Sequence, residues 1–191
     1  MTQSLAPVHP GAPSPVATSS PPRPTELVEV PGVPTVLLAL AGLLAFGACV
    51  GLGTPAWSSF TATALVPIAG LVGAAVLTGP ALVAGLIFLR PDVAAEVPVA
   101  ALGRGIAAGG SLAAGLAPMA LFLVATSGLW PLVLLAGFAV AGIGVAVVTV
   151  RTLMRAAGGK LGFVAAWIVL AVLVGLRIAF GVGAMAMEGL R

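Results

Sequence analysis

Long apolar segments alternate with short polar segments along this chain of 191 residues. The apolar segments lie near residues 33–53, 60–89, 105–126, 130–150 and 161–187. About 20 helical residues cross a hydrocarbon layer of about 30 Å, so each segment is long enough for one membrane span. The alternating ten-residue pattern of a transmembrane β-barrel does not occur. The sequence therefore predicts an all-α, polytopic membrane bundle of about five transmembrane helices.

The second segment, Phe60 to Leu89, is longer than one straight span requires. Gly79-Pro80 lies inside it, and a proline removes one helical hydrogen bond and clashes with the preceding turn. Two interpretations follow from this pattern. The segment is either one kinked span or a re-entrant pair of shorter helices.

Composition points to the same class of protein. Hydrophobic residues make up 60% of the chain and charged residues only 7%, with a mean hydropathy of +1.23. A soluble domain needs more polar side chains than this to cover its surface. The formal charge of +3 rests on eight Lys or Arg against five Asp or Glu, so it does not indicate nucleic-acid binding. We expect the lipid bilayer as the main partner.

Residues 1–32 differ from residues 33–191, which form the expected transmembrane domain. Prolines recur here among Ser, Thr, Ala and Gly, and they disfavour both helix and sheet. The sequence predicts a disordered, Pro-rich tail with polyproline II character. Its Pro21-Pro22-Arg23-Pro24 stretch has the spacing that docks in aromatic grooves, which leaves room for a cytoplasmic partner. A solvated tail without a partner is the interpretation that we favour.

The distribution of cations predicts the orientation. With five spans, the tail, the second loop and the fourth loop share one side, which carries Arg23, Arg90, Arg104, Arg151, Arg155 and Lys160. The opposite side carries Arg191 alone. Cationic loops stay in the cytoplasm. We therefore expect a bacterial cytoplasmic (inner) membrane protein with its N-terminus in the cytoplasm and its C-terminus outside. Trp57 and Trp130 would then lie at the outer interface, and Trp167 near the inner one.

Arg177 is the only charged residue well inside an apolar segment. A charge near mid-bilayer costs a few kcal/mol on insertion scales, and no other span offers an acid to pair with it. One interpretation is a hydrated cavity or a contact with an anion. The other, which we favour, is a span that ends early, so that Arg177 reaches the outer headgroups.

Prolines and glycines inside the spans are further candidates. Pro67, Gly79, Pro80 and Pro118 mark places where a helix loses a hydrogen bond and a backbone carbonyl becomes available. Broken helices of this kind form ion and substrate sites in transporters. The alternative, which we favour, is a structural kink that neighbouring helices or hydroxyl side chains satisfy.

Small residues also recur at a spacing of four. The pairs are Gly47 with Gly51, Gly105 with Gly109, and Ser111 with Gly115. Small residues at this spacing let two helix backbones approach closely. We expect such contacts within one bundle rather than between two copies.

Catalytic chemistry finds little support in the sequence. The chain has one cysteine, Cys49, and one histidine, His9, which lies in the polar tail. No nucleophile with a base, carboxylate pair, phosphate-binding loop or set of metal ligands can be assembled from the motifs. We expect a protein that is not an enzyme and that uses no cofactor or metal.

Several short motifs occur in an order that resembles bacterial multi-pass proteins related to the Ypt-interacting protein (Yip) family. They are Leu65-Val66-Pro67, Leu77-Thr78-Gly79-Pro80-Ala81-Leu82, Leu116-Ala117-Pro118-Met119 with Leu121-Phe122, and Trp167 followed by Val174-Gly175-Leu176. The resemblance covers roughly residues 33–185. It implies a five-span bundle with a polar cytoplasmic tail and a role in membrane organisation. The family's lysine before the first proline and its Arg-Pro-Phe in the last span are replaced here by apolar residues.

Two functional hypotheses follow. The leading one is a non-enzymatic inner-membrane scaffold that recruits partners or organises the membrane, alone or as a subunit or oligomer. The alternative is a small transporter or channel component that uses Arg177 and the proline-broken helices.

Overall fold

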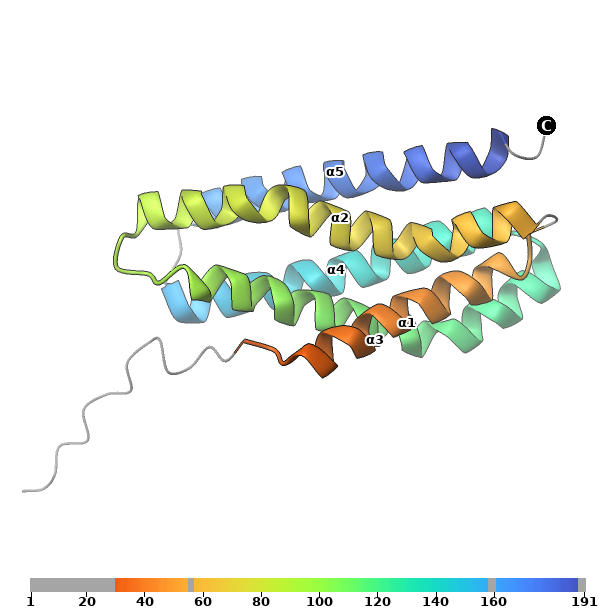
Figure 1. Cartoon of the computed structure of the whole chain (residues 1–191), viewed down its shortest axis with the longest axis horizontal. Coiled ribbons are helices and arrows are strands. Elements are labelled where there is room, and N and C mark those ends of the chain that lie inside the picture. Colours follow the sequence, from red (N-terminus) through yellow and green to blue (C-terminus); the bar gives the residue numbers. More distant parts are fainter. Residues whose placement is uncertain (1–29, 55–56, 158–160, 189–191) are drawn as a thin grey trace, which may run out of the picture.

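A computed structural model of the chain describes residues 30–54, 57–157 and 161–188 (Figure 1). This part of the chain consists of five helices joined by short turns and contains no strand. The helices are α1 (Val33–Gly51), α2 (Trp57–Leu89), α3 (Glu96–Ser127), α4 (Trp130–Ala157) and α5 (Leu161–Glu188). All five are long and apolar enough to cross a membrane. The predicted all-α, multi-pass membrane bundle is therefore confirmed, whereas most of the predicted tail, residues 1–29, lies outside the described residues.

The segment around Gly79-Pro80 is one helix, not a re-entrant pair. α2 is continuous over 33 residues, about 50 Å, with both Pro67 and Pro80 inside it. Side chains strengthen the helix next to Pro80. The Thr78 hydroxyl donates to the carbonyl oxygen of Ala74 at 2.7 Å, and the indole Nε1 of Trp167 donates to the carbonyl oxygen of Thr78 at 2.9 Å. A transmembrane helix tolerates proline where neighbouring groups supply such hydrogen bonds.

Two helices are longer than the predicted spans. α3 begins at Glu96 rather than at residue 105, and α4 continues to Ala157 rather than ending at residue 150. Charged residues mark where a chain leaves the hydrocarbon, but they do not end a helix. The added turns are held by a second apolar cluster at this end of the bundle, formed by Leu82, Leu86, Val97, Ala101, Leu102, Leu153, Val164 and Trp167.

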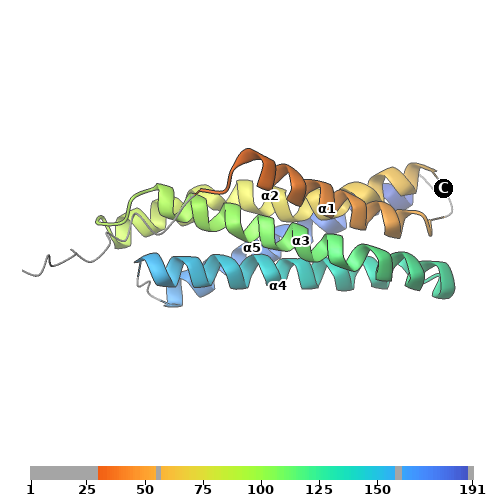
Figure 2. The same ribbon diagram turned by 90° about the horizontal axis from the view of Figure 1, so that it is seen from below.

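The helices run alternately up and down and form an elongated bundle (Figures 1 and 2). α3 packs extensively against α1 and α4, and α2 packs against α1 and α5. α4 and α5 touch each other only slightly. The helices thus follow the order α5, α2, α1, α3, α4 around the bundle, with a weak contact where the ring would close.

Close backbone approach holds the α1 side of the bundle together. A methyl group at Gly42 or Gly110 would overlap the facing backbone of α3 or α1, and one at Gly47 would overlap Ala64 of α2. Gly105 and Gly109 face α4 in the same way. Two of the three small-residue pairs therefore pack within the bundle, as expected. The third does not, because Ser111 and Gly115 are exposed.

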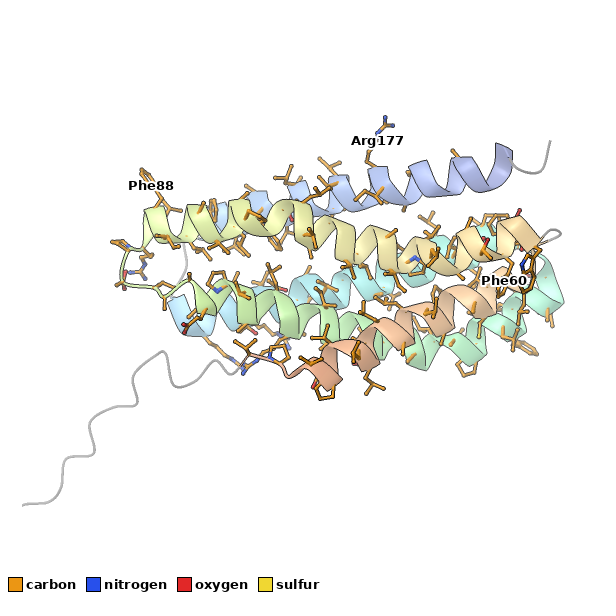
Figure 3. All side chains as sticks on the ribbon, in the orientation of Figure 1. Phe60, Phe88 and Arg177 are labelled. Carbon is orange, nitrogen blue, oxygen red and sulfur yellow. The ribbon has the colours of Figure 1, made fainter. Side chains whose placement is uncertain are left out.

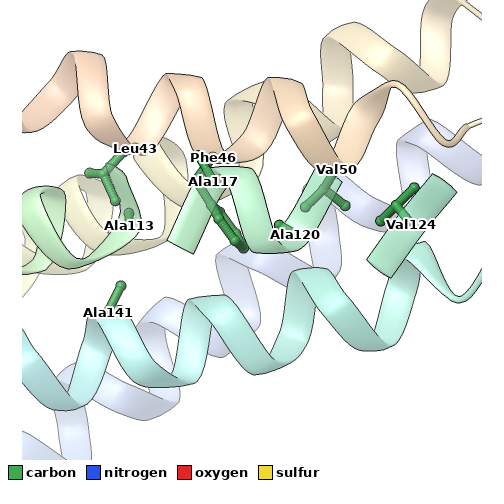
Figure 4. Packing of buried hydrophobic residues seen from close by; sticks show 8 residues of the cluster. All are labelled: Leu43, Phe46, Val50, Ala113, Ala117, Ala120, Val124 and Ala141. Atoms are coloured by element: carbon green, nitrogen blue, oxygen red, sulfur yellow. The ribbon is translucent and has the colours of Figure 1, made fainter. Parts of the chain in front are cut away.

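Phe46 fills the centre of the main apolar cluster (Figure 4). Its ring lies against Gly137 of α4, where any side chain would overlap it. Phe46 is 2% exposed and its neighbours Leu43 and Val50 are fully buried. Within lipid, helices associate through packing of this kind rather than through the hydrophobic effect.

The two ends of the bundle differ in charge. The turn between α2 and α3 carries Arg90 and Asp92, and the end of α4 beside it carries Arg151 and Arg155. At the opposite end Trp57 is 76% exposed and stacks on Phe60 with ring centroids 4.9 Å apart. Trp167 was expected near an interface, but it is only 7% exposed. Its hydrogen bond to α2 makes it a core residue.

Candidate functional site

A cavity lies where α5 stands away from α4. It has a volume of about 360 Å³ and a length that follows the helix axes. α2, α4 and α5 supply almost all of its wall, and α3 adds Leu102. Many of the residues that line the cavity are small. They are Gly70, Ala74, Ala75, Ala139, Gly142, Ala146, Ala171 and Gly175.

This shape follows from how α5 is seated. Gly175 lies against the backbone of Gly70 and the side chain of Ala74, so α5 approaches α2 closely. The facing surface of α4 includes the short side chains of Ala139 and Ala146 and no side chain at Gly142, which leaves space beside α5, although Phe138 of α4 extends towards Gly175.

The chemistry of the cavity is apolar. Its lining contains no charged residue, and the one polar side-chain nitrogen, Nε1 of Trp167, already donates to Thr78. Its volume is at the lower end of the range for small-molecule sites, about 300–1,000 Å³. Such a surface accommodates hydrocarbon, either lipid chains or apolar side chains, and offers no hydrogen bond to a polar solute.

Arg177 does not face this cavity. Its side chain is exposed and projects away from the bundle on the outer side of α5 (Figure 3). On the same helix, Gly175 and Ile178 face α2, where Ile178 approaches Gly73. α2 and the cavity are therefore on the opposite side of α5 from Arg177.

The proline and glycine candidates do not form one site. Pro67 is fully buried in α2, whereas Pro80 lies about 20 Å further along the same helix and is exposed. Gly79 is buried and faces Leu102, and Pro118 is exposed on α3. Neither these four residues nor Arg177 line the cavity.

Residues that could hold a metal do not gather in the described ranges, where no three of His, Cys, Asp and Glu come together. The cavity itself escaped the sequence reasoning. The sequence signal that could have indicated the cavity is a row of small residues on α4 at a spacing of three and four, formed by Ala139, Gly142 and Ala146. That pattern is hard to separate from the many other Gly and Ala residues of this chain.

The fold and this apolar site define the class as a polytopic α-helical membrane protein. Comparison with family models, with curated proteins and with solved structures gives no match for the chain. The resemblance to the Yip family therefore stays an expectation from the motifs.

Proposed function

We propose that this protein is a non-enzymatic, Yip-like scaffold of the bacterial cytoplasmic membrane that recruits or organises partner proteins. The observation that carries the proposal is the position of α5, which is fastened mainly to α2. Its contact with α4 is slight, and its outer side contacts no described helix. A membrane bundle with one peripheral, one-sided helix has a surface on which another transmembrane segment can pack.

The chemistry of the bundle supports recruitment better than transport. A path for a polar solute needs polar groups along it, as in transporters that use broken helices. Here the described cavity is apolar, and the prolines and Arg177 that such a path would use lie apart. This arrangement therefore favours recruitment over transport.

Co-isolation tests the proposal directly. The full chain, tagged at its C-terminus, is purified from its own membranes in a mild detergent, and co-isolated chains are measured by quantitative mass spectrometry. We expect a membrane protein at near-stoichiometric amount that also recovers this chain when it is tagged itself. A monodisperse protein without partners that moves a solute into liposomes would replace the scaffold with the transport alternative.

Orientation is tested separately. Reporter fusions after Arg90 and after Arg151 should report a cytoplasmic location, and a fusion at the C-terminus should report the outside. The physical reason is the retention of Arg and Lys on the cytoplasmic side. A cytoplasmic C-terminus would contradict the proposed orientation.

A further inference from the structure

Arg177 lies at mid-depth of its helix. α5 continues for 16 residues before it and for 11 residues after it, about 24 Å and 16 Å along the axis. The neighbouring helix α2 places Arg177 at the same depth. Ile178, the next residue of α5, lies against Gly73, which is the middle residue of the 33-residue α2. Arg177 is therefore more than two helical turns, about 11 Å, from either end. The candidate span of α5 ends at Gly181, but the helix continues to Glu188 and α2 places Arg177 near the middle of the bundle, so this depth argues against a simple reach to the headgroups.

Arg177 is also on a face that the bundle leaves uncovered. Leu173 and Phe180 beside it are 59% and 66% exposed, and Leu170 is 46% exposed. Charged residues inside a membrane almost always face a bundle interior, a watery cavity or a charged partner. Arg177 contacts none of these among the described residues, and an unpaired arginine at this depth opposes membrane insertion.

The chain cannot supply the missing counter-charge. Its five acids stand at positions 26, 29, 92, 96 and 188, and none is at mid-depth of a span. A second copy of this chain would therefore bring a second arginine and no acid to this depth. An acidic side chain at this depth would therefore come from a different protein.

We infer that the outer face of α5 around Arg177 binds a transmembrane helix of another protein that carries an aspartate or glutamate near mid-bilayer. An ion pair with Arg177 would offset the cost of both buried charges, and the guanidinium fork suits a carboxylate. The next turn of the face is small, with Gly181, around which nothing lies within 4 Å, followed by Ala184. Small residues there allow the partner's backbone to approach closely. This inference rests on the proposed recruiting function and names its partner's chemistry.

A synthetic helix tests the charge. The probe is a leucine–alanine peptide of about 20 residues with flanking lysines and one aspartate at its centre. Binding to the full-length protein in nanodiscs of zwitterionic lipid is followed by energy transfer between labels on the two molecules. We expect the aspartate peptide to bind about tenfold more tightly than the same peptide with leucine, a difference of about 1.4 kcal/mol.

Variants of the protein locate the effect. Arg177→Leu should abolish the preference for aspartate, and Arg177→Lys should keep most of it. Arg151→Leu is the matched control, because Arg151 is an exposed arginine at the end of the bundle, and it should leave the preference unchanged. Equal binding of both peptides to the unaltered protein would overturn the inference. A preference that persists in Arg177→Leu would overturn it as well.

Photo-crosslinking in cells tests the natural partner. A photoreactive amino acid replaces Leu173 on this face or, as a control, Met119 on α3, which has nearly the same exposure, 61% against 59%. We expect Leu173 to capture a helix with an acid at mid-span, and Arg177→Leu to reduce that capture about tenfold. Capture of lipid alone, of a second copy, or of a helix without an acid would overturn the inference. A co-isolated partner that crosslinks at Met119 only would leave the recruiting function intact and exclude this face.

Discussion

α1 and α5 are equally apolar helices with opposite surroundings. Each is a candidate span with no acidic residue in its first turn and no basic residue in its last, yet 33% of the apolar stretch of α1 is buried against 17% for α5. α1 packs on both α2 and α3 and sends Phe46 to α4, while α5 depends on α2. The difference teaches that apolarity places a helix in the membrane, whereas small residues at contact points place it in the bundle.

The strongest test of this contrast uses two glycines of α3. In Gly110→Leu the new side chain would collide with the backbone of Ala39 on α1, and no flexible group can move aside. Because total stabilities are about 5–15 kcal/mol, we expect little folded, monodisperse protein in detergent. The matched control is Gly115→Leu, since nothing lies within 4 Å of that position. Equal recovery of the two variants by size-exclusion chromatography would contradict the backbone contact.

Next in size is the effect of Phe46→Ala. The substitution leaves a cavity at the centre of the α1, α3 and α4 contact and should cost about 3–5 kcal/mol. The apparent Tm in detergent, followed by circular dichroism, measures the loss. Phe88→Ala is the control, because Phe88 is 89% exposed and projects outward (Figure 3). If both variants melt alike, Phe46 is not the main packing residue of α1.

A smaller effect is expected on the α5 side from Trp167→Phe. It removes the hydrogen bond from Nε1 to Thr78 but keeps most of the ring, so we expect a loss of about 1 kcal/mol. Hydrogen exchange should rise in α5 and around Pro80 of α2, and stay unchanged in α1. Trp57→Phe, at an exposed position, should change neither helix. Faster exchange in α1 would show that the two sides of the bundle are not independent.

Deleting residues 1–29 should have the smallest effect. The deletion keeps Pro31, which precedes α1 and lies next to Gly103 of α3. A solvated Pro-rich segment buries little apolar surface, so the apparent Tm should change by less than about 2 °C. Exchange in α1, which follows the tail directly, should stay as slow as before. A large loss of stability would mean that the tail packs on the bundle.

Sequence reasoning found the spans because hydrocarbon thickness alone fixes their length and apolarity. It did not show that α3 starts before Arg104 and that α4 continues past Arg151, because a charge limits how deep a residue lies in the membrane and does not end a helix. It could not choose between a kinked and a re-entrant α2, since that depends on hydrogen bonds from Trp167 and Thr78 to carbonyls near Pro80. It placed Arg177 well inside the fifth segment, but it could not show which side of α5 the arginine lies on.

What the sequence by itself determined is the class of protein, the number of spans and the presence of one arginine among apolar residues. Those properties are local, because each span meets the bilayer independently of the others. Only the tertiary structure decided that Gly42 and Gly110 meet, that α4 and α5 barely touch, and that Arg177 faces away from the cavity. These depend on how helices with similar Gly and Ala content rotate against one another, and that rotation is set by side-chain packing across the whole bundle.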